Sequence, residues 1–256
     1  MRPNRVRQRW AEGRPASCLW IDLGWTASVE ALARLPYDSF TLDLQHSLID
    51  RGTAVHVLQT LSLGQGAPLV RVTQNDPAEI GFVLDAGAYG VICPQIETAD
   101  DCKRFVDACR YGPRGGRSWG PTRGLLYGGP DYFAEYEKQI LKIALIETVK
   151  GITNMEAIAA TPGLDMLYVG PNDLSIDYGG VPTYVASDPR VIDAMDRSIS
   201  IARAHGIRSG TYAGTIDVAK SAIAKGFDLI SVGYAAKLMV KACSDVLGQV
   251  FPESAR

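Results

Sequence analysis

The sequence contains no apolar run approaching the roughly 20 residues that a membrane-spanning helix needs. It also lacks a GxGxxG motif after its first predicted strand, the loop that holds dinucleotide phosphates in open α/β sheets. Neither sign of charge dominates, since 26 basic residues face 28 acidic ones for a net charge of −2. These absences argue against a membrane protein, a dinucleotide-binding fold and a surface for nucleic acid. They leave a small anionic substrate open.

Cysteine is scarce and is not spaced as in a zinc site or a disulfide framework. The five cysteines are odd in number, form no CxxC pair, and several stand in apolar stretches, where a thiol behaves as a small core residue. A reduced, cytoplasmic setting fits this usage best. Residues 1–16 are rich in arginine but lack the apolar core of a signal peptide, so we expect a short surface helix or tail there.

What the sequence does have is an alternation of short apolar runs and helical patterns. The runs are nearly continuous in hydrophobicity, as in parallel strands that are buried on both faces. The eight predicted strands are 18–23, 39–44, 67–72, 90–94, 141–146, 166–170, 207–212 and 229–233. Eight strands, each followed by a helix, predict a single (β/α)8 TIM barrel over residues 1–256. A doubly wound open sheet is the competing fold.

Helix boundaries are marked by capping residues. Helical periodicity is clearest at 78–86, 101–109 and 191–204. The predicted helix starts carry capping oxygens at Asp76, Thr98 and Asp188. The predicted helix ends carry glycines suited to a left-handed cap at Gly64, Gly87, Gly206 and Gly226. Residues 111–130 form a long Gly-rich stretch, which we expect to be a functional or mobile loop.

Two carboxylates follow neighbouring predicted strands. Glu147 comes directly after 141–146, and Asp173 ends the turn Gly170-Pro171-Asn172-Asp173 after 166–170. In a barrel the carboxyl ends of the strands meet at the active-site mouth. A salt bridge for Glu147 and a helix cap for Asp173 are the structural alternatives. As a pair, the two supply only hard oxygen ligands, which suits Mg²⁺ or Mn²⁺, with Co²⁺ also possible.

Three further polar residues are predicted on the same rim. Asp43 and His46 flank the end of the second strand, where an aspartate can fix the tautomer of a histidine base. Arg71 stands inside an apolar strand, where a guanidinium needs an anion. It is expected either to pair structurally with Asp43 or to stabilise a developing enolate oxygen. Taken alone, a histidine that follows a strand, such as His46, is more often a structural residue than a catalytic base.

A Schiff-base mechanism is disfavoured, because it requires a desolvated lysine near the barrel mouth. Lys142 stands at the opposite end of its predicted strand, and Lys150 lies beyond Glu147 in the following loop or helix.

These motifs, in this order, resemble the class II pyruvate aldolases of the 4-hydroxy-2-oxoheptanedioate and 2-keto-3-deoxy-sugar-acid type, in the phosphoenolpyruvate/pyruvate-domain superfamily. The similarity extends from Trp20 to Gly233. It is carried by Asp43-Leu44-Gln45-His46, Val70-Arg71-Val72, Leu84-Asp85-Ala86-Gly87-Ala88, Arg110-Tyr111-Gly112-Pro113-Arg114-Gly115-Gly116-Arg117, Ile146-Glu147-Thr148 and Val169-Gly170-Pro171-Asn172-Asp173-Leu174-Ser175.

The resemblance implies a role for each matching residue. Glu147 and Asp173 would bind the metal, and His46 would be the base, assisted by Asp43 and by an Asp85 that a neighbouring subunit can supply. Arg71 would stabilise the enolate. The substrate carboxylate would bind backbone amides around Gly170, Asn172 and Asp173. The family also implies a homo-oligomer, a hexamer built as a trimer of dimers.

The expected activity is reversible cleavage of 4-hydroxy-2-keto acids to pyruvate, or a related 2-keto acid, and an aldehyde. The Gly-rich stretch 111–130 is expected to close over the aldehyde. This chain has Leu145 where many members have a substrate-contacting glutamine, and Ser47 where many have glycine, so the substrate is not specified. The alternatives are another lyase acting through an enolate, of the oxaloacetate decarboxylase or acyl-CoA lyase type, and a non-catalytic barrel that binds a keto acid.

Overall fold

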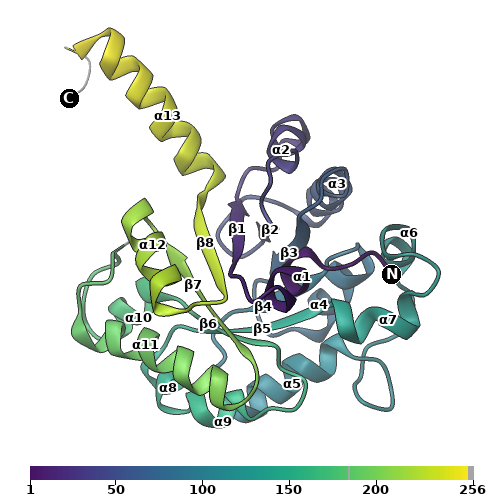
Figure 1. The fold of residues 1–256 in the computed structure, drawn as a ribbon. Coiled ribbons are helices and arrows are strands. Elements are labelled where there is room, and N and C mark those ends of the chain that lie inside the picture. The colour runs from purple at the N-terminus through teal and green to yellow at the C-terminus, as the bar shows by residue number, and fades with distance from the viewer. Residues whose placement is uncertain (184, 253–256) are drawn as a thin grey trace.

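The structure, a computed structural model, describes residues 1–183 and 185–252. Its strands form one closed barrel in sequence order, with every neighbouring pair parallel (Figure 1). They are β1 (Ala16–Ile21), β2 (Ser39–Asp43), β3 (Ala67–Arg71), β4 (Gly90–Cys93), β5 (Leu141–Ile146), β6 (Met166–Val169), β7 (Arg208–Ala213) and β8 (Leu229–Tyr234). The predicted (β/α)8 barrel is confirmed, and the open sheet is excluded.

Helices surround this barrel. They are α1 (Arg5–Ala11), α2 (Thr26–Ala33), α3 (Arg51–Leu61), α4 (Pro77–Asp85), α5 (Ala99–Cys109), α6 (Thr122–Gly128), α7 (Tyr132–Gln139), α8 (Val149–Thr153), α9 (Met155–Ala159), α10 (Pro171–Asp177), α11 (Pro189–Ala204), α12 (Ile216–Lys225) and α13 (Ala235–Val250). The described helices include none long and apolar enough to cross a membrane.

The predicted helix starts are confirmed, because the side chains of Asp76, Thr98 and Asp188 accept hydrogen bonds from first-turn amides. Three of the four predicted glycine caps have the expected positive φ, at Gly87, Gly206 and Gly226. The prediction for Gly64 is wrong. A Cβ there would lie 2.1 Å from the carbonyl oxygen of Ala33, so close backbone approach, rather than a left-handed φ, requires this glycine.

Strand alternation sorts the side chains into two layers. Leu69, Ile143 and Met166 fill the barrel interior, while their neighbours on the same strands pack outward against the helices. Side chains two residues apart on a strand point to the same face. Arg71 on β3 and Glu147 after β5 therefore point inward like Leu69 and Ile143. The sequence therefore aims these two polar side chains at the interior where the strands end.

The amino end of the barrel is closed by α1. Its Val6 and Trp10 are buried with the interior side chains, and the Trp10 indole donates a hydrogen bond to the carbonyl of Asp228, just before β8. This leaves the carboxyl end of the barrel as the place where a functional site can form.

The last helix behaves differently from the others. Figure 1 shows α13 extending away from the barrel. Its apolar side chains are exposed, and they are Leu238, Met239, Val240, Val246, Leu247 and Val250. A helix that exposes this much apolar surface lacks a covering layer within the described chain.

Candidate active site

A small cavity of about 50 Å³ lies at the carboxyl ends of the strands. It is lined by Trp20, Arg71, Leu145, Glu147, Tyr168, Gly170, Pro171, Asn172, Asp173, Tyr212 and Tyr234. The structure thus brings together the metal, enolate and carboxylate positions predicted from sequence. His46, Asp43 and Asp85 are not among the lining residues.

Glu147 is a buried carboxylate with few partners. It is only 5% exposed, and its Oε1 accepts a hydrogen bond of 3.0 Å from the backbone amide of Gln95 rather than from a cationic side chain. Burial, and then the charge of Asp173, raise the pKa of Glu147 to about 7. The Gln95 amide and the more distant Arg71 charge lower it by less. A carboxylate whose ionisation is disfavoured by burial and by a neighbouring carboxylate would be stabilised in its charged form by a cation bound between the two.

Asp173 is the other member of this pair. It lies in the first turn of α10, whose N-cap is Gly170, so it is not the helix cap that was the structural alternative. The side-chain oxygen of Asn172, the residue before it, is buried and finds no hydrogen-bond partner among the described residues. Three oxygen-bearing side chains, those of Glu147, Asn172 and Asp173, therefore line one small cavity, and the Asn172 oxygen is an unsatisfied acceptor there.

The donor set fits a divalent metal that keeps open coordination positions. Across residues 1–183 and 185–252, no group of three or more His, Cys, Asp or Glu side chains could enclose a metal. Mg²⁺ is commonly held by only one or two carboxylates, and water or substrate completes its coordination shell. Glu147 and Asp173 match that pattern, and the unpartnered Asn172 oxygen adds a neutral acceptor beside them.

Arg71 and Asp43 are opposed residues on β3 and β2. Arg71 Nε lies 2.9 Å from Asp43 Oδ1, and Nη2 lies 2.5 Å from Oδ2, so the pair is bidentate and buried. The guanidinium also lies over the Trp20 ring, 4.5 Å from its centroid. Asp43 engages one N–H of Nε and one of Nη2, so the two N–H groups of Nη1 and the second of Nη2 are not used by this ion pair. The structural ion pair and the substrate-facing role are therefore compatible.

His46 is exposed on the loop after β2, at the same end of the barrel as the cavity. The Asp43 carboxylate accepts hydrogen bonds from the backbone amides of Gln45 and His46, at 3.0 and 3.2 Å. Asp43 thus fixes the loop that carries His46, by contact with its backbone.

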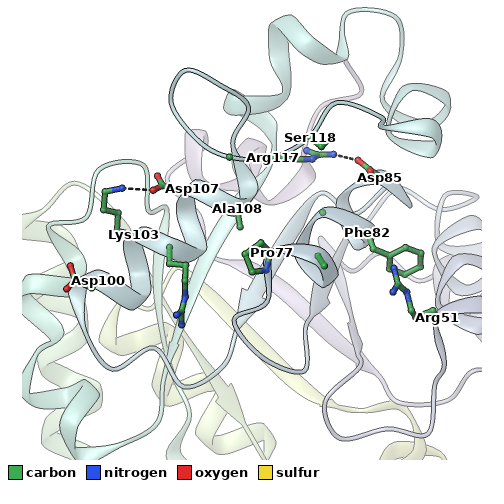
Figure 2. A pocket seen from close by; sticks show the side chains of 14 residues that line it. Arg51, Pro77, Phe82, Asp85, Asp100, Lys103, Asp107, Ala108, Arg117 and Ser118 are labelled. Carbon is green, nitrogen blue, oxygen red and sulfur yellow. Dashed lines mark hydrogen bonds and ion pairs between the residues drawn. The ribbon is translucent and has the colours of Figure 1, made fainter.

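Asp85 lies in a different place, at the end of α4 in a groove of about 880 Å³ between α4 and α5. Figure 2 shows its carboxylate paired with Arg117, at 2.7 Å. Arg117 also donates to the Tyr132 hydroxyl and lies over the Tyr111 ring. A role for Asp85 in this cavity would therefore need a second copy of the chain.

The Gly-rich stretch 111–130 is held against α4 and does not line the cavity. Arg117 anchors it through Asp85, and Arg123 donates to the carbonyl of Ala86 at 2.9 Å. Part of it is helical, forming α6. Within one chain Arg117 and Arg123 are engaged away from the cavity, and the closure of this stretch over the aldehyde stays a prediction.

The sequence reasoning missed the aromatic wall of the cavity, formed by Trp20, Tyr168, Tyr212 and Tyr234. Trp20, Tyr168 and Tyr212 stand at positions where the alternation of side chains along their strands points inward, so the sequence pattern could have identified them. Tyr234 could not be found in this way.

No lysine is among the cavity residues. Lys142 lies near the amino end of β5, where its Nζ is 2.8 Å from Asp165, and Lys150 pairs with Glu97 on the surface. The cavity therefore offers acid–base and electrostatic chemistry, without an amine nucleophile.

Comparison with known proteins agrees with this chemistry. Residues 16–242 match the HpcH/HpaI aldolase/citrate lyase family. A hydroxypyruvate/pyruvate aldolase of Rhizorhabdus wittichii is 39% identical over 228 residues, covering 89% of this chain and 91% of that protein. A 5-keto-4-deoxy-D-glucarate aldolase of Klebsiella pneumoniae is 34% identical over 233 residues, covering 90% of each.

The fold agrees as well. A solved HpcH/HpaI aldolase/citrate lyase family protein from Burkholderia cenocepacia superimposes with a TM-score of 0.89 at 31% identity, covering 96% of this chain and 99% of that one. The resemblance noted in the sequence is confirmed. The chain belongs to the HpcH/HpaI aldolase/citrate lyase family, within the phosphoenolpyruvate/pyruvate-domain superfamily, and is a lyase of the aldolase type.

Proposed function

We propose that this chain is a divalent-metal-dependent aldolase that reversibly cleaves 4-hydroxy-2-keto acids to pyruvate, or a related 2-keto acid, and an aldehyde. The observation that carries the proposal is the buried Glu147 carboxylate beside the exposed Asp173 carboxylate, since both line one cavity with Arg71. The relatives named as hydroxypyruvate/pyruvate aldolase and 5-keto-4-deoxy-D-glucarate aldolase support the same reaction class.

Held by Glu147 and Asp173, Mg²⁺ or Mn²⁺ would polarise the keto group of the substrate and acidify its C3 protons. Arg71 lines the cavity and would stabilise the negative oxygen of the enolate. Leu145 and the aromatic wall exclude water, which strengthens both interactions. The backbone amides of Asn172 and Asp173 would receive the substrate carboxylate.

His46 is proposed as the base that removes a C3 proton. Its exposed loop is positioned by Asp43, which is itself fixed by Arg71, so the base and the enolate-stabilising cation are held by one buried ion pair. In the cleavage direction, the same histidine would take the proton of the C4 hydroxyl as the C3–C4 bond breaks, and would deliver it to C3 of the enolate once the aldehyde has departed.

A homo-oligomer of the hexamer type is proposed as the working form. The exposed apolar residues of α13 supply a surface that a second copy would cover. Asp85 supplies a second reason, because only another subunit would bring its carboxylate to a His46.

The proposal is tested by incubating the protein with a 4-hydroxy-2-keto acid and measuring the 2-keto acid and aldehyde released. Both products are expected in equal amounts, only with Mg²⁺ or Mn²⁺, and not after EDTA treatment. CO₂ release from oxaloacetate without any aldol cleavage would instead indicate a decarboxylase. Full cleavage activity in EDTA would overturn the metal assignment.

A further inference from the structure

The end of β8 departs from regular strand alternation. Leu229 faces the barrel interior and Ile230 and Val232 face the helices, so continued alternation would turn residue 234 outward. The pairing with β1 breaks this rule. Cys18 is opposite Ser231 and Trp20 is opposite Tyr234, so a step of two residues on β1 matches three on β8.

Gly233 is the residue that makes this bulge possible. Its φ is +82°, a conformation that residues with a Cβ rarely adopt. A Cβ at this position would also lie 3.1 Å from the Leu238 side chain. Bulges beside active sites commonly re-aim a side chain, and here the bulge turns Tyr234 into the cavity.

Tyr234 completes the aromatic wall beside the enolate-stabilising arginine. Its ring lies 5.3 Å from the Trp20 ring and 5.4 Å from the Tyr212 ring. Trp20 in turn lies beneath Arg71. The phenol therefore stands near the position where Arg71 would bind the keto oxygen on C2.

The phenol is a hydrogen-bond donor in this setting. Burial raises the pKa of Tyr234 above its ordinary value, and the positive charge of Arg71 opposes this by less, so the hydroxyl stays protonated at neutral pH. The buried indole nitrogen of the adjacent Trp20 is also a donor, without a partner among the described residues. This wall thus presents donors to an oxygen atom of the substrate, in a cavity with room for only a small group.

We propose that Tyr234 is a specificity-determining residue that favours 2-keto acids with a hydroxyl group on C3 over those with a methyl group there. This inference rests on the proposed function, because binding of the keto oxygen by Arg71 places C3 beside the phenol. A hydroxyl and a methyl are similar in size, so the discrimination comes from the hydrogen bond rather than from the space available.

The test compares metal-dependent C3 proton exchange of hydroxypyruvate, 2-oxobutyrate and pyruvate in the full-length protein and in Tyr234→Phe. The unaltered protein is expected to favour hydroxypyruvate over 2-oxobutyrate in kcat/KM by at least roughly tenfold, the effect of one well-placed hydrogen bond. Tyr234→Phe should bring this ratio near one, and pyruvate, which carries neither group on C3, reports any general loss of exchange activity in the variant. Tyr37→Phe, outside the cavity, is the matched control and should leave the ratio unchanged.

An unchanged ratio in Tyr234→Phe would overturn the inference. No exchange with any donor in the unaltered protein would instead reject the proposed function, so the two failures can be told apart. The bulge is tested separately by Gly233→Ala, which should lose the preference for hydroxypyruvate. Gly206→Ala, which imposes the same backbone strain at a positive φ with open space around it, should retain the preference. A normal ratio in folded Gly233→Ala protein would contradict the role of the bulge.

Discussion

Arg71 binds Asp43 through two parallel hydrogen bonds across neighbouring strands, and both side chains are almost fully buried. The same aspartate accepts hydrogen bonds from the loop amides that precede and carry His46. One ion pair therefore links the cation at the cavity to the proposed base on the rim. It makes Arg71 important for stability as well as for chemistry.

Replacing Arg71 with methionine should leave the Asp43 carboxylate buried and unpaired. Breaking a buried ion pair in this way typically lowers the free energy of unfolding by about 3–5 kcal/mol. Urea unfolding monitored by circular dichroism measures the loss. The double variant Arg71→Met, Asp43→Leu should regain much of it, because no lone charge remains. Equal stability of Arg71→Met and the unaltered protein would show that the pair does not form in solution.

Replacing His46 with alanine should affect activity and not stability. Because His46 is exposed, the free energy of unfolding should change by no more than about 0.5 kcal/mol. Loss of a general base should lower kcat by roughly 10²- to 10⁴-fold. His56→Ala, an exposed histidine on α3, is the matched control and should keep full activity. Equal activity of the two variants would remove His46 from the mechanism.

Glu147 should make the metal-free protein less stable as the pH rises. Its folded-state pKa of about 7 exceeds the ordinary value of 4.5, so between these pH values the folded state binds the extra proton. The contribution of Glu147 to the free energy of unfolding is fully present below pH 4.5 and is lost as the pH rises through 7. The difference of about 2.5 pKa units corresponds to roughly 3.5 kcal/mol of unfolding free energy, at about 1.4 kcal/mol for each unit.

Urea unfolding at pH 5 and pH 8 in EDTA measures this effect, and the comparison with Glu147→Gln isolates it from other groups. The glutamine variant should be the more stable of the two at pH 8 and should gain nothing from added Mn²⁺. Identical pH dependence in both proteins would contradict the assigned pKa.

Charge on the exposed apolar surface of α13 should dissociate the proposed homo-oligomer. Val240→Glu with Leu247→Glu should shift the molar mass measured by light scattering toward that of one 27.6 kDa chain. Gln249→Glu adds the same type of charge at an exposed polar position and should leave the mass unchanged. A single-chain mass for the unaltered protein would reject the proposed oligomer.

The sequence predicted the features that depend on local patterns. Apolar runs located the strands, and the parity of β3 and β5 explains why Arg71 and Glu147 point inward together. The sequence could not predict the position of the Asp85 carboxylate. Asp85 pairs with Arg117, 32 residues away in the chain, and this pair lies in the groove between α4 and α5. Nor could the sequence predict the inward turn of Tyr234, which depends on a shift in register with β1 that no periodicity records.

The most direct test of the account is proton exchange at C3 of pyruvate in deuterated water, followed by nuclear magnetic resonance without any aldehyde present. This measures formation of the enolate, the step for which Glu147, Asp173, Arg71 and His46 are proposed to act. Exchange is predicted to require Mg²⁺ or Mn²⁺, to stop on addition of EDTA, and to fall at least roughly 100-fold in folded Glu147→Gln protein. Exchange at the full rate in EDTA or in Glu147→Gln would contradict the account.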